Sequence, residues 1–393
     1  MPLRRSTSGR PTGVRLRALQ RKFARLRNPD GGVASSGVPK VPRRPADQPR
    51  SLMDFQRAFP DEAACADYME RVRWPDGFTC PSCGVRGAPY RFATYPAILE
   101  CRACRKETSL TAGTVMHGSK MKLHVWFWAA YLVSTQTPGM SALQFQRQLD
   151  LSRYETAFQL LHKLRAGMVR PDKDHIGQEW PVEVDESFVG GRTKGKGRGN
   201  TDSPLVIAAV EVRTRRHEKT GRRQVYAGRL RLRHIVSRER AEIEEFIRDS
   251  IAPGSIVRTD GWGGYGAIGR FQYQHDPMVL DGDHGKIDKH LPLIHVVFSN
   301  LKTWLRGTHH GVSAHHLQAY LNEYVFRFNR RFYPMTSFAS VLGIGTVRSG
   351  PTYRGLYDGD YVHPNPPPRR RRRTAAKTAT ALRLRRRRQN GES

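Results

Sequence analysis

The sequence has no apolar run as long as the ~20 residues that a membrane-spanning helix needs. Its nearest approach, LHVWFWAAYLV at residues 123–133, is about half that length and is typical of a buried helix. No hydrophobic secretion segment follows the first methionine. These absences argue against a membrane or secreted protein, and they predict a protein of the cytoplasm.

Cysteine is also scarce, because only five occur among 393 residues. Four of them form two close pairs in FTCPSCG and ECRACRK, with the spacing C-x2-C-x17-C-x2-C. Two thiolates three positions apart can hold one ion in a tight turn, and two such turns complete the tetrahedron that Zn²⁺ favours. We predict a structural zinc site on Cys80, Cys83, Cys101 and Cys104, with disulfides as the alternative that a reducing cytosol disfavours. Cys65 is expected to be a small buried residue instead.

Acidic residues are few, since 35 Asp and Glu stand against 67 Lys and Arg, for a net charge of +32. Residues 1–50 carry 13 basic and two acidic side chains, and residues 366–393 carry 11 and one, so 21 of the 32 excess charges lie in these two basic tails. Such segments bury too little apolar surface to fold alone. They predict either polyphosphate binding or a merely solvated surface. The first tail also weakly resembles a transit peptide. Alternatively, the start codon has been assigned too far upstream, and these residues are not part of the protein.

Hydrophobic periodicity divides the rest of the chain into helical and strand-rich parts. Residues 120–170 have helical spacing, whereas VEVDESFVG, PLVIAAVEV and VYAGRLRLRHI alternate and are rich in β-branched residues. A helix, a fourth strand and two more helices follow, an order that predicts an α/β sandwich. We divide the chain into a basic tail, a zinc ribbon with a preceding helix, a helical linker domain, an α/β domain and a C-terminal extension: 1–50, 51–115, 116–175, 176–345 and 346–393.

Two aspartates lie where strands could present them to a common site. In VEVDES, alternation places Glu183 and Asp185 on one face and the valines on the other. A charged residue inside an apolar strand is costly unless it is paired or bound to metal. Asp260 follows the apolar strand SIVRT, at the kind of strand end where α/β proteins often place site residues. Each has a structural alternative: a surface strand residue for Asp185 and an Asp-Gly turn for Asp260.

The segment LPLIHVVFSNLKTWLRGTHH predicts a helix with a histidine and a lysine beside its apolar stripe. His295 and Lys302 are seven residues apart, so at about 100° per residue they project within about 20° of each other. Asn300 projects roughly opposite that stripe, and Glu323 in the next helix also points away. His295 is therefore the residue best placed to share a site with the two aspartates.

From about residue 51 to residue 341 the chain resembles the insertion-sequence transposases of the ISXO-two-like group. The resemblance rests on DFQRAFPDEAACADYMERVRWPDGFTCPSCG, VDESFVGGR, TDGWGGY and NLKTWLRGTHHGVSAHHLQAYLNEYVFRFNRRF. It implies an N-terminal zinc ribbon and a ribonuclease-H-like catalytic domain of α/β class. It also implies two metal ions held by an Asp, Asp and Glu set, with a lysine seven residues after the third carboxylate.

Matched residue by residue, Asp185 and Asp260 take the places of the first two carboxylates, and Lys302 takes the place of the lysine. His295 stands at the third position, where many relatives have glutamate. Imidazole suits hard Mg²⁺ less well than carboxylate does and suits Mn²⁺ better. The resemblance thus implies catalytic Mg²⁺ or Mn²⁺ with His295 as a ligand. A decayed site, or Asn300 as the third ligand, is the alternative.

The segment MSALQFQRQLDLSRYETAFQLLHKLR predicts two helices around a short turn, which resembles a helix-turn-helix that reads DNA ends. An ordinary helical hairpin is the alternative. Six polar side chains are expected on the second helix: Arg153, Tyr154, Gln159, His162, Lys163 and Arg165. Of these, Arg153, Lys163 and Arg165 are expected to bind DNA. The basic loop GGRTKGKGRGN lacks the P-loop pattern, so its cations are expected to contact the DNA backbone: Arg192, Lys194 and Lys196. The histidines of HHGVSAHH are expected in a loop near DNA, with a metal site as the alternative.

The resemblance implies a transposase that cleaves and joins DNA by metal-dependent phosphoryl transfer. Its partners would be double-stranded DNA, both the terminal inverted repeats of its element and target DNA. Further copies of the chain would join it in a homodimer or larger assembly on the prokaryotic nucleoid. Two other classes stay open: a ribonuclease-H-like nuclease or resolvase that cuts without joining, and a non-catalytic zinc-ribbon repressor that only binds DNA.

Overall fold

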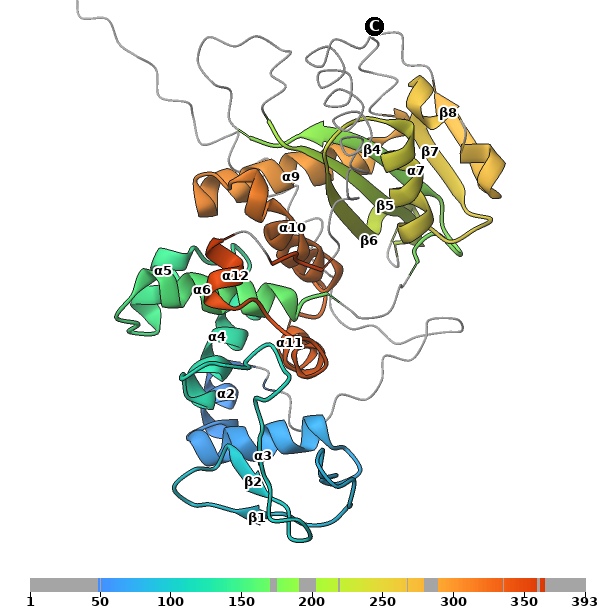
Figure 1. Ribbon diagram of the computed structural model, residues 1–393. Helices are drawn as coiled ribbons and strands as arrows, with labels where there is room; N and C mark the ends of the chain where they lie inside the picture. The colour runs from blue at the N-terminus through green and yellow to red at the C-terminus, as the bar shows by residue number, and fades with distance from the viewer. Residues whose placement is uncertain are drawn as a thin grey trace, which may run out of the picture.

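The computed structural model describes residues 49, 51–169, 175–190, 203–217, 220–266, 268–278, 289–334, 336–358 and 361–364. Apart from residue 49, both basic tails lie outside the described residues, as does the loop at 191–202. The described chain runs from a small ribbon at one end, through a helical middle part, to a mixed sheet at the other end (Figure 1). None of the described helices is long and apolar enough to cross a membrane.

The N-terminal part consists of two helices and a three-stranded antiparallel ribbon. Its elements are α2 (Leu52–Ala58), α3 (Glu62–Arg73), β1 (Tyr90–Arg91), β2 (Ile98–Glu100) and β3 (Glu107–Ser109). The side chains of Ser51 and Asp61 cap the two helices by accepting hydrogen bonds from N–H groups three residues ahead, at 3.1 and 2.9 Å. Pro60 lies between the helices and cannot continue the first one.

The middle part is helical and shares one hydrophobic core with the N-terminal part. Its elements are α4 (Leu123–Thr135), α5 (Ala142–Gln148), α6 (Tyr154–Ala166), α11 (Thr336–Thr346) and α12 (Tyr353–Tyr357). Phe55 on α2, Phe127 on α4 and Phe338 on α11 all lie in this core. The domain boundary predicted at residue 345 places α11 in the α/β domain. The structure packs α11 here instead, because its apolar side chains complete the core around α4.

A mixed five-stranded sheet forms the α/β part, with the strand order β6-β5-β4-β7-β8. The strands are β4 (Val182–Phe188), β5 (Leu205–Arg216), β6 (Arg223–Ile235), β7 (Ile256–Asp260) and β8 (Gln274–Met278). The first three pair antiparallel, whereas β7 is parallel to both β4 and β8. Numbered along the chain, the order is 3-2-1-4-5, which is the ribonuclease-H-like arrangement that the resemblance implies. The sequence does not predict β8, an edge strand (QHDPM) without β-branched residues.

Helices cover both faces of the sheet, so the predicted α/β sandwich is confirmed (Figure 1). They are α7 (Arg240–Ser250), α9 (Pro292–His309) and α10 (Ala314–Asn329). Helices α9 and α10 pack with one set of β5 and β6 side chains, and α7 packs on the other face. Two short 3-10 helices, η1 (Gly263–Tyr265) and η2 (Ile268–Phe271), follow β7.

A polar joint connects the middle part to the α/β part. The guanidinium of Arg165 on α6 donates to the carboxylate of Glu323 on α10 at 2.9 Å, and both side chains are 1% exposed. The indole N–H of Trp304 and the hydroxyl of Thr308, both on α9, donate to the carbonyl of Pro138 at 3.0 and 2.9 Å. These contacts hold α9 and α10 against the helical part, which positions the site described next.

Candidate active site

Asp185 and Asp260 lie on neighbouring strands at the same level of the sheet. Strands β4 and β7 are parallel, with Glu183 opposite Arg258. The same register, continued two residues further, places Asp185 beside Asp260, and side chains at matched positions of parallel strands share a face. That face is the one covered by α9. Two carboxylates far apart in the sequence are thus brought together.

Glu183, on the same face of β4, sets where α9 begins. Its buried carboxylate accepts hydrogen bonds from the N–H groups of Leu293 and Ile294 at 2.9 and 2.8 Å. Helix α9 has no side-chain cap from its own N-cap residue, so Glu183 satisfies N–H groups that a helix start leaves open. Burial raises the pKa of Glu183 to about 7, although the two hydrogen bonds and Arg258 oppose the rise. Sequence reasoning missed this role, because alternation shows only which face Glu183 shares with Asp185.

One turn into α9, His295 faces Asp185. Its Nδ1 lies 4.0 Å from Oδ2 of Asp185, which is too long for a hydrogen bond. Ligand atoms lie about 2.1 Å from a Mg²⁺ ion, so two of them are about 3 Å apart when adjacent and about 4 Å apart when opposite. The observed separation therefore leaves room for one ion between imidazole and carboxylate. The imidazole is 40% exposed, so it is accessible from outside.

Two turns further along α9, Lys302 reaches the same strand. Its Nζ donates to Oγ of Ser187 at 2.7 Å. Ser187 is two residues after Asp185, so it lies on the same face of β4. Partial burial lowers the pKa of Lys302, whereas the charge of Asp185 raises it. The structure thus brings together the four predicted site residues of the α/β part, and their catalytic roles stay predictions.

Asp185 is held in an environment that disfavours its negative charge. Its pKa is raised from 3.8 to about 7, first by burial and then by the negative charges of Glu186 and Asp260. The N–H of Glu186, which donates to Oδ1 at 2.8 Å, and the charge of Arg238 offset only part of this rise. Such a carboxylate favours either a proton or an added cation. Its oxygen donors, with one imidazole, suit Mg²⁺ or Mn²⁺.

Glu186 points to the opposite face of β4, where its contacts connect the end of β4 to the end of β7. It accepts a hydrogen bond from the hydroxyl of Tyr265 and lies 3.3 Å from the guanidinium of Arg238. Burial raises the pKa of both Glu186 and Tyr265. Tyr265 belongs to η1, directly after β7, and the N–H of Trp262 there donates to Asp260 at 3.4 Å. This cluster ties β4 to the segment that carries Asp260.

The other polar candidates lie elsewhere. Glu323 is buried in the polar joint, where it pairs with Arg165 at 2.9 Å and with Arg327 at 3.4 Å. Its carboxylate already has two counter-charges, and these lower its pKa. Asn300 is five residues after His295, so helical periodicity turns it to a different side of α9.

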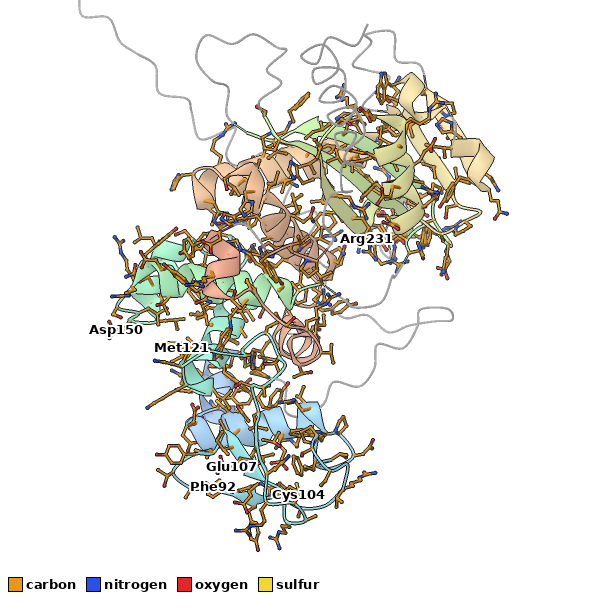
Figure 2. The ribbon with its side chains drawn as sticks, in the orientation of Figure 1. Phe92, Cys104, Glu107, Met121, Asp150 and Arg231 are labelled. Atoms are coloured by element: carbon orange, nitrogen blue, oxygen red, sulfur yellow. The ribbon has the colours of Figure 1, made fainter. Side chains whose placement is uncertain are left out.

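The four ribbon cysteines converge on one point, as the sequence predicts. Their sulfur atoms all lie within 4.8 Å of one another, and two pairs are 3.7 Å apart: Cys80 with Cys104, and Cys83 with Cys101. A Zn–S bond of about 2.3 Å sets neighbouring sulfurs of a tetrahedral site about 3.8 Å apart. The cluster thus fits zinc. It lies at the opposite end of the molecule from the sheet: Figure 2 labels Cys104 in the ribbon and Arg231 on β6 of the sheet. Cys65 is buried outside the cluster, and burial raises its pKa to about 12.

The turns at the two cysteine pairs have matching geometry. The residue after the second cysteine of each pair has a left-handed backbone, with φ of +73° at Gly84 and +60° at Arg105. Each of these N–H groups donates to the carbonyl of the first cysteine in its pair, at 2.9 Å for both. Two equivalent turns therefore present their thiols to one another, which is how a four-thiolate site is built.

The structure corrects the predicted DNA surface of α6. Lys163 is buried and donates to the carbonyl of His117 at 2.6 Å, and Arg165 is paired with Glu323. His162 is fully buried too. Lys163 and Arg165 are 5% and 1% exposed, and their donor groups are bonded inside the protein, so this structure does not present them to DNA as the sequence predicted. The cause is the buried carboxylate of Glu323, which requires a counter-charge from α6.

The start of α6 stays open to DNA. Arg153 and Tyr154 are exposed there, and Gln159 borders a shallow groove together with Arg153 and Tyr353. The first residues of a recognition helix are those that reach base edges in a helix-turn-helix. The basic loop residues predicted to contact the DNA backbone lie outside the described residues: Arg192, Lys194 and Lys196.

Comparison with known proteins agrees with both halves of this architecture. Residues 177–329 match an ISXO2-like transposase domain, and residues 60–107 match a transposase zinc-ribbon domain. The chain is also 26% identical over 281 residues to an uncharacterized protein in transposable element ISH50 of Halobacterium salinarum. That alignment covers 69% of this chain and 92% of the halobacterial protein. No solved structure shows a significant match to the chain.

Proposed function

We propose that this chain, which carries the zinc ribbon and the ISXO2-like domain of an insertion-sequence transposase, cleaves DNA at the ends of its element and joins those ends to target DNA. The observation that carries the proposal is the convergence of Asp185, Asp260 and His295 on one face of the sheet. The imidazole of His295 lies 4.0 Å from Asp185, a spacing that one shared ion would bridge.

The three residues would hold two divalent cations, Mg²⁺ or Mn²⁺. When bound, these ions would activate the attacking hydroxyl and stabilise the leaving oxygen of a displacement at phosphorus. The carboxylates of Asp185 and Asp260 and the imidazole of His295 would supply the ligand atoms for these ions. The donor set fits, because burial and neighbouring carboxylates hold the pKa of Asp185 at about 7 and so favour an added positive charge.

Lys302 would hold a phosphate of the DNA end. It projects from the same side of α9 as His295, and its ammonium group hydrogen-bonds to Ser187 beside Asp185. An ammonium group on a long stem can turn from a neutral hydroxyl to a charged phosphate. Glu183 would act only by positioning, because it holds the start of α9 and therefore the place of His295.

DNA would extend from the exposed start of α6 to the candidate active site on the sheet. Arg153 would contact the terminal repeat from the exposed start of α6, and the basic loop would follow the phosphate backbone: Arg192, Lys194 and Lys196. The basic tails would add affinity that does not depend on sequence. We infer that the partners are double-stranded terminal repeats and target DNA, bound by two or more copies of the chain on the cytoplasmic nucleoid.

Asp185→Asn and Asp260→Asn test the proposal. Each removes a charge proposed to hold metal, so strand cleavage of a duplex that carries the terminal repeat of the element should be lost in Mg²⁺ and in Mn²⁺. Binding of the same duplex should stay within about twofold of wild type, because neither residue is proposed to read DNA. Asp276→Asn on β8, an exposed aspartate paired with Arg258 at 3.3 Å, is the matched control and should still cleave. Cleavage retained by either test variant would remove that residue from the site.

A second assay separates transposition from simple cutting. Wild-type protein is given terminal-repeat duplexes that already end in a free 3′-hydroxyl, together with a target plasmid. A transposase joins the two, whereas a nuclease or resolvase that only cuts does not. A non-catalytic repressor binds the duplex and changes neither DNA.

A further inference from the structure

Three histidines from distant parts of the chain meet at the joint between the helical part and the α/β part. His162 lies on α6, His316 lies on α10, and His363 follows α12. Each offers one ring nitrogen to a group whose atoms all lie within 4.8 Å of one another. This group contains neither the ribbon cysteines nor the aspartates of the candidate active site. His316 is the one member that comes from the histidine-rich segment HHGVSAHH.

The spacing of the rings suits a shared ion. Nδ1 of His162 and Nε2 of His363 are 3.2 Å apart. Two nitrogens bound to one tetrahedral Zn²⁺ at about 2.0–2.1 Å are separated by about 3.3 Å, close to this value. Burial also lowers the pKa of each ring, so the three imidazoles are neutral at ordinary pH and each keeps a lone pair.

Packing alone leaves the polar atoms of this cluster incompletely satisfied. Among the described residues, the buried nitrogens without a hydrogen-bond partner include Nδ1 of His316. The hydrogen bond between Nδ1 of His162 and Nε2 of His363 does not involve His316. The other ring nitrogens of His162 and His363 also lack partners, but they are not the atoms that face each other. Since buried polar atoms normally have partners, a third ring that faces this pair without one indicates that a ligand is missing.

Aromatic rings pack against all three histidines. The ring centroid of Phe158 lies 4.3 Å from that of His162 and 5.4 Å from that of His316, and the ring centroid of Tyr361 lies 4.9 Å from that of His363. The charge of the nearby Arg165 is paired with Glu323, so it is balanced before any ion enters.

We propose that His162, His316 and His363 bind a transition-metal ion, with Zn²⁺ as the favoured one. Imidazole ligands suit Zn²⁺ and its neighbours in the first transition row, whereas Mg²⁺ favours oxygen ligands, and the three histidines supply none. The site is structural, because His162 is 0% and His363 6% exposed and neither can meet a nucleic acid. The bound ion fastens α6 and the segment after α12 to α10. It thereby sets the orientation of the DNA-facing helices relative to the catalytic sheet.

Metal content of the full chain tests this site. The protein is produced without a histidine tag in cobalt-supplemented cells, and it carries Asp185→Asn so that the candidate active site does not contribute an ion. Cobalt at four thiolates shows sulfur-to-metal charge transfer, which a nitrogen-only site lacks. We expect a second equivalent of cobalt beyond the one that this absorption reports. Adding His316→Gln should remove the second equivalent, whereas His315→Gln, the exposed neighbour on the same helix, should keep both.

His363→Gln gives an independent check if His316→Gln does not fold, because His363 lies after the last helix and not within one. It should also lose the second equivalent and keep the thiolate absorption. The proposal is overturned if the parent chain holds only the thiolate-bound ion, or if the second ion persists in both histidine variants. Neither result bears on strand cleavage, which depends on Asp185 and Asp260.

Discussion

Asp185→Asn should stabilise the protein in the absence of added divalent cations. In the structure the pKa of Asp185 is raised from 3.8 to about 7, chiefly by burial and then by the charges of Glu186 and Asp260. Between about pH 4 and pH 7 the folded chain therefore keeps a proton that the unfolded chain releases. The stability of the wild type falls as pH rises through this window, and the penalty is constant above it.

The size of the effect follows from the same pKa. In the wild type, the charge of Asp185 lowers the free energy of unfolding by up to about 1.4 kcal/mol for each pH unit in this window, and the uncharged asparagine avoids this loss. Between pH 5.5 and pH 7, the difference in the free energy of unfolding between the variant and the wild type should therefore increase by up to about 2 kcal/mol. At about 2–4 °C per kcal/mol for a unit of this size, the difference in melting temperature should widen by about 4–8 °C. Glu183, whose pKa is also raised to about 7, is present in both proteins, so its contribution cancels.

Thermal unfolding followed by circular dichroism at pH 5.5, 7 and 8 measures this difference. The buffers omit Mg²⁺ and Mn²⁺ and contain no chelator, because a chelator would also remove structural zinc. Added Mn²⁺ should then raise the melting temperature of the wild type more than that of the variant, since an ion that binds only the folded state stabilises it. A difference that does not change with pH, or a variant less stable than wild type at pH 8, would refute the view that Asp185 is an uncompensated buried acid.

Three further predictions concern positioning, the polar joint and the tails. Glu183→Ala should cost about 1–3 kcal/mol in a urea titration and also reduce strand cleavage. Glu62→Ala is the control, because Glu62 caps α4 in the same way, with hydrogen bonds of 2.7 and 2.9 Å. It should lower stability by a similar amount while the folded protein still cleaves DNA. Equal losses of activity in the two variants would show that Glu183 has no positioning role. Arg165→Ala should cost about 3–5 kcal/mol, because Glu323 loses its buried partner, yet leave the DNA affinity of the folded protein unchanged. Arg153→Ala should weaken end binding in a gel-shift assay with little loss of stability, and the reverse pattern would make Arg165 a DNA contact after all. Deleting both basic tails should flatten the salt dependence of DNA binding, whereas a sharp fall in the preference for end DNA over random DNA would show that the tails read sequence.

Local patterns in the sequence account for much of the fold and for the placement of the site residues. Alternation along VEVDES places Glu183 and Asp185 on one face, and the helical period places His295 and Lys302 on one side of α9. Both inferences require only residues within two turns or one strand of each other. The cysteine spacing is equally local, because each tight turn holds its own pair and a four-thiolate site follows once the turns meet.

The features that the sequence did not reveal depend on partners far along the chain. The cap that Glu183 provides involves N–H groups 110 and 111 residues later. Arg165 has the charge and helical position of a DNA contact, and only its partner 158 residues later shows that it is buried. His162 and His363 are 201 residues apart, so no local spacing suggests that they meet. Tertiary contacts of this kind overrule the local pattern wherever a buried charge or ring requires a partner.

Strand transfer by two alanine variants of α9 tests the central claim most directly. His295→Ala and Asn300→Ala are compared at matched folding stability, with pre-cleaved terminal-repeat duplex, target plasmid and Mn²⁺. If His295 completes the metal site with Asp185 and Asp260, His295→Ala gives no joined product, and Asn300→Ala stays close to wild type. Loss of joining in Asn300→Ala together with normal joining in His295→Ala would contradict the account, and it would make His295 an ordinary residue at the edge of the core.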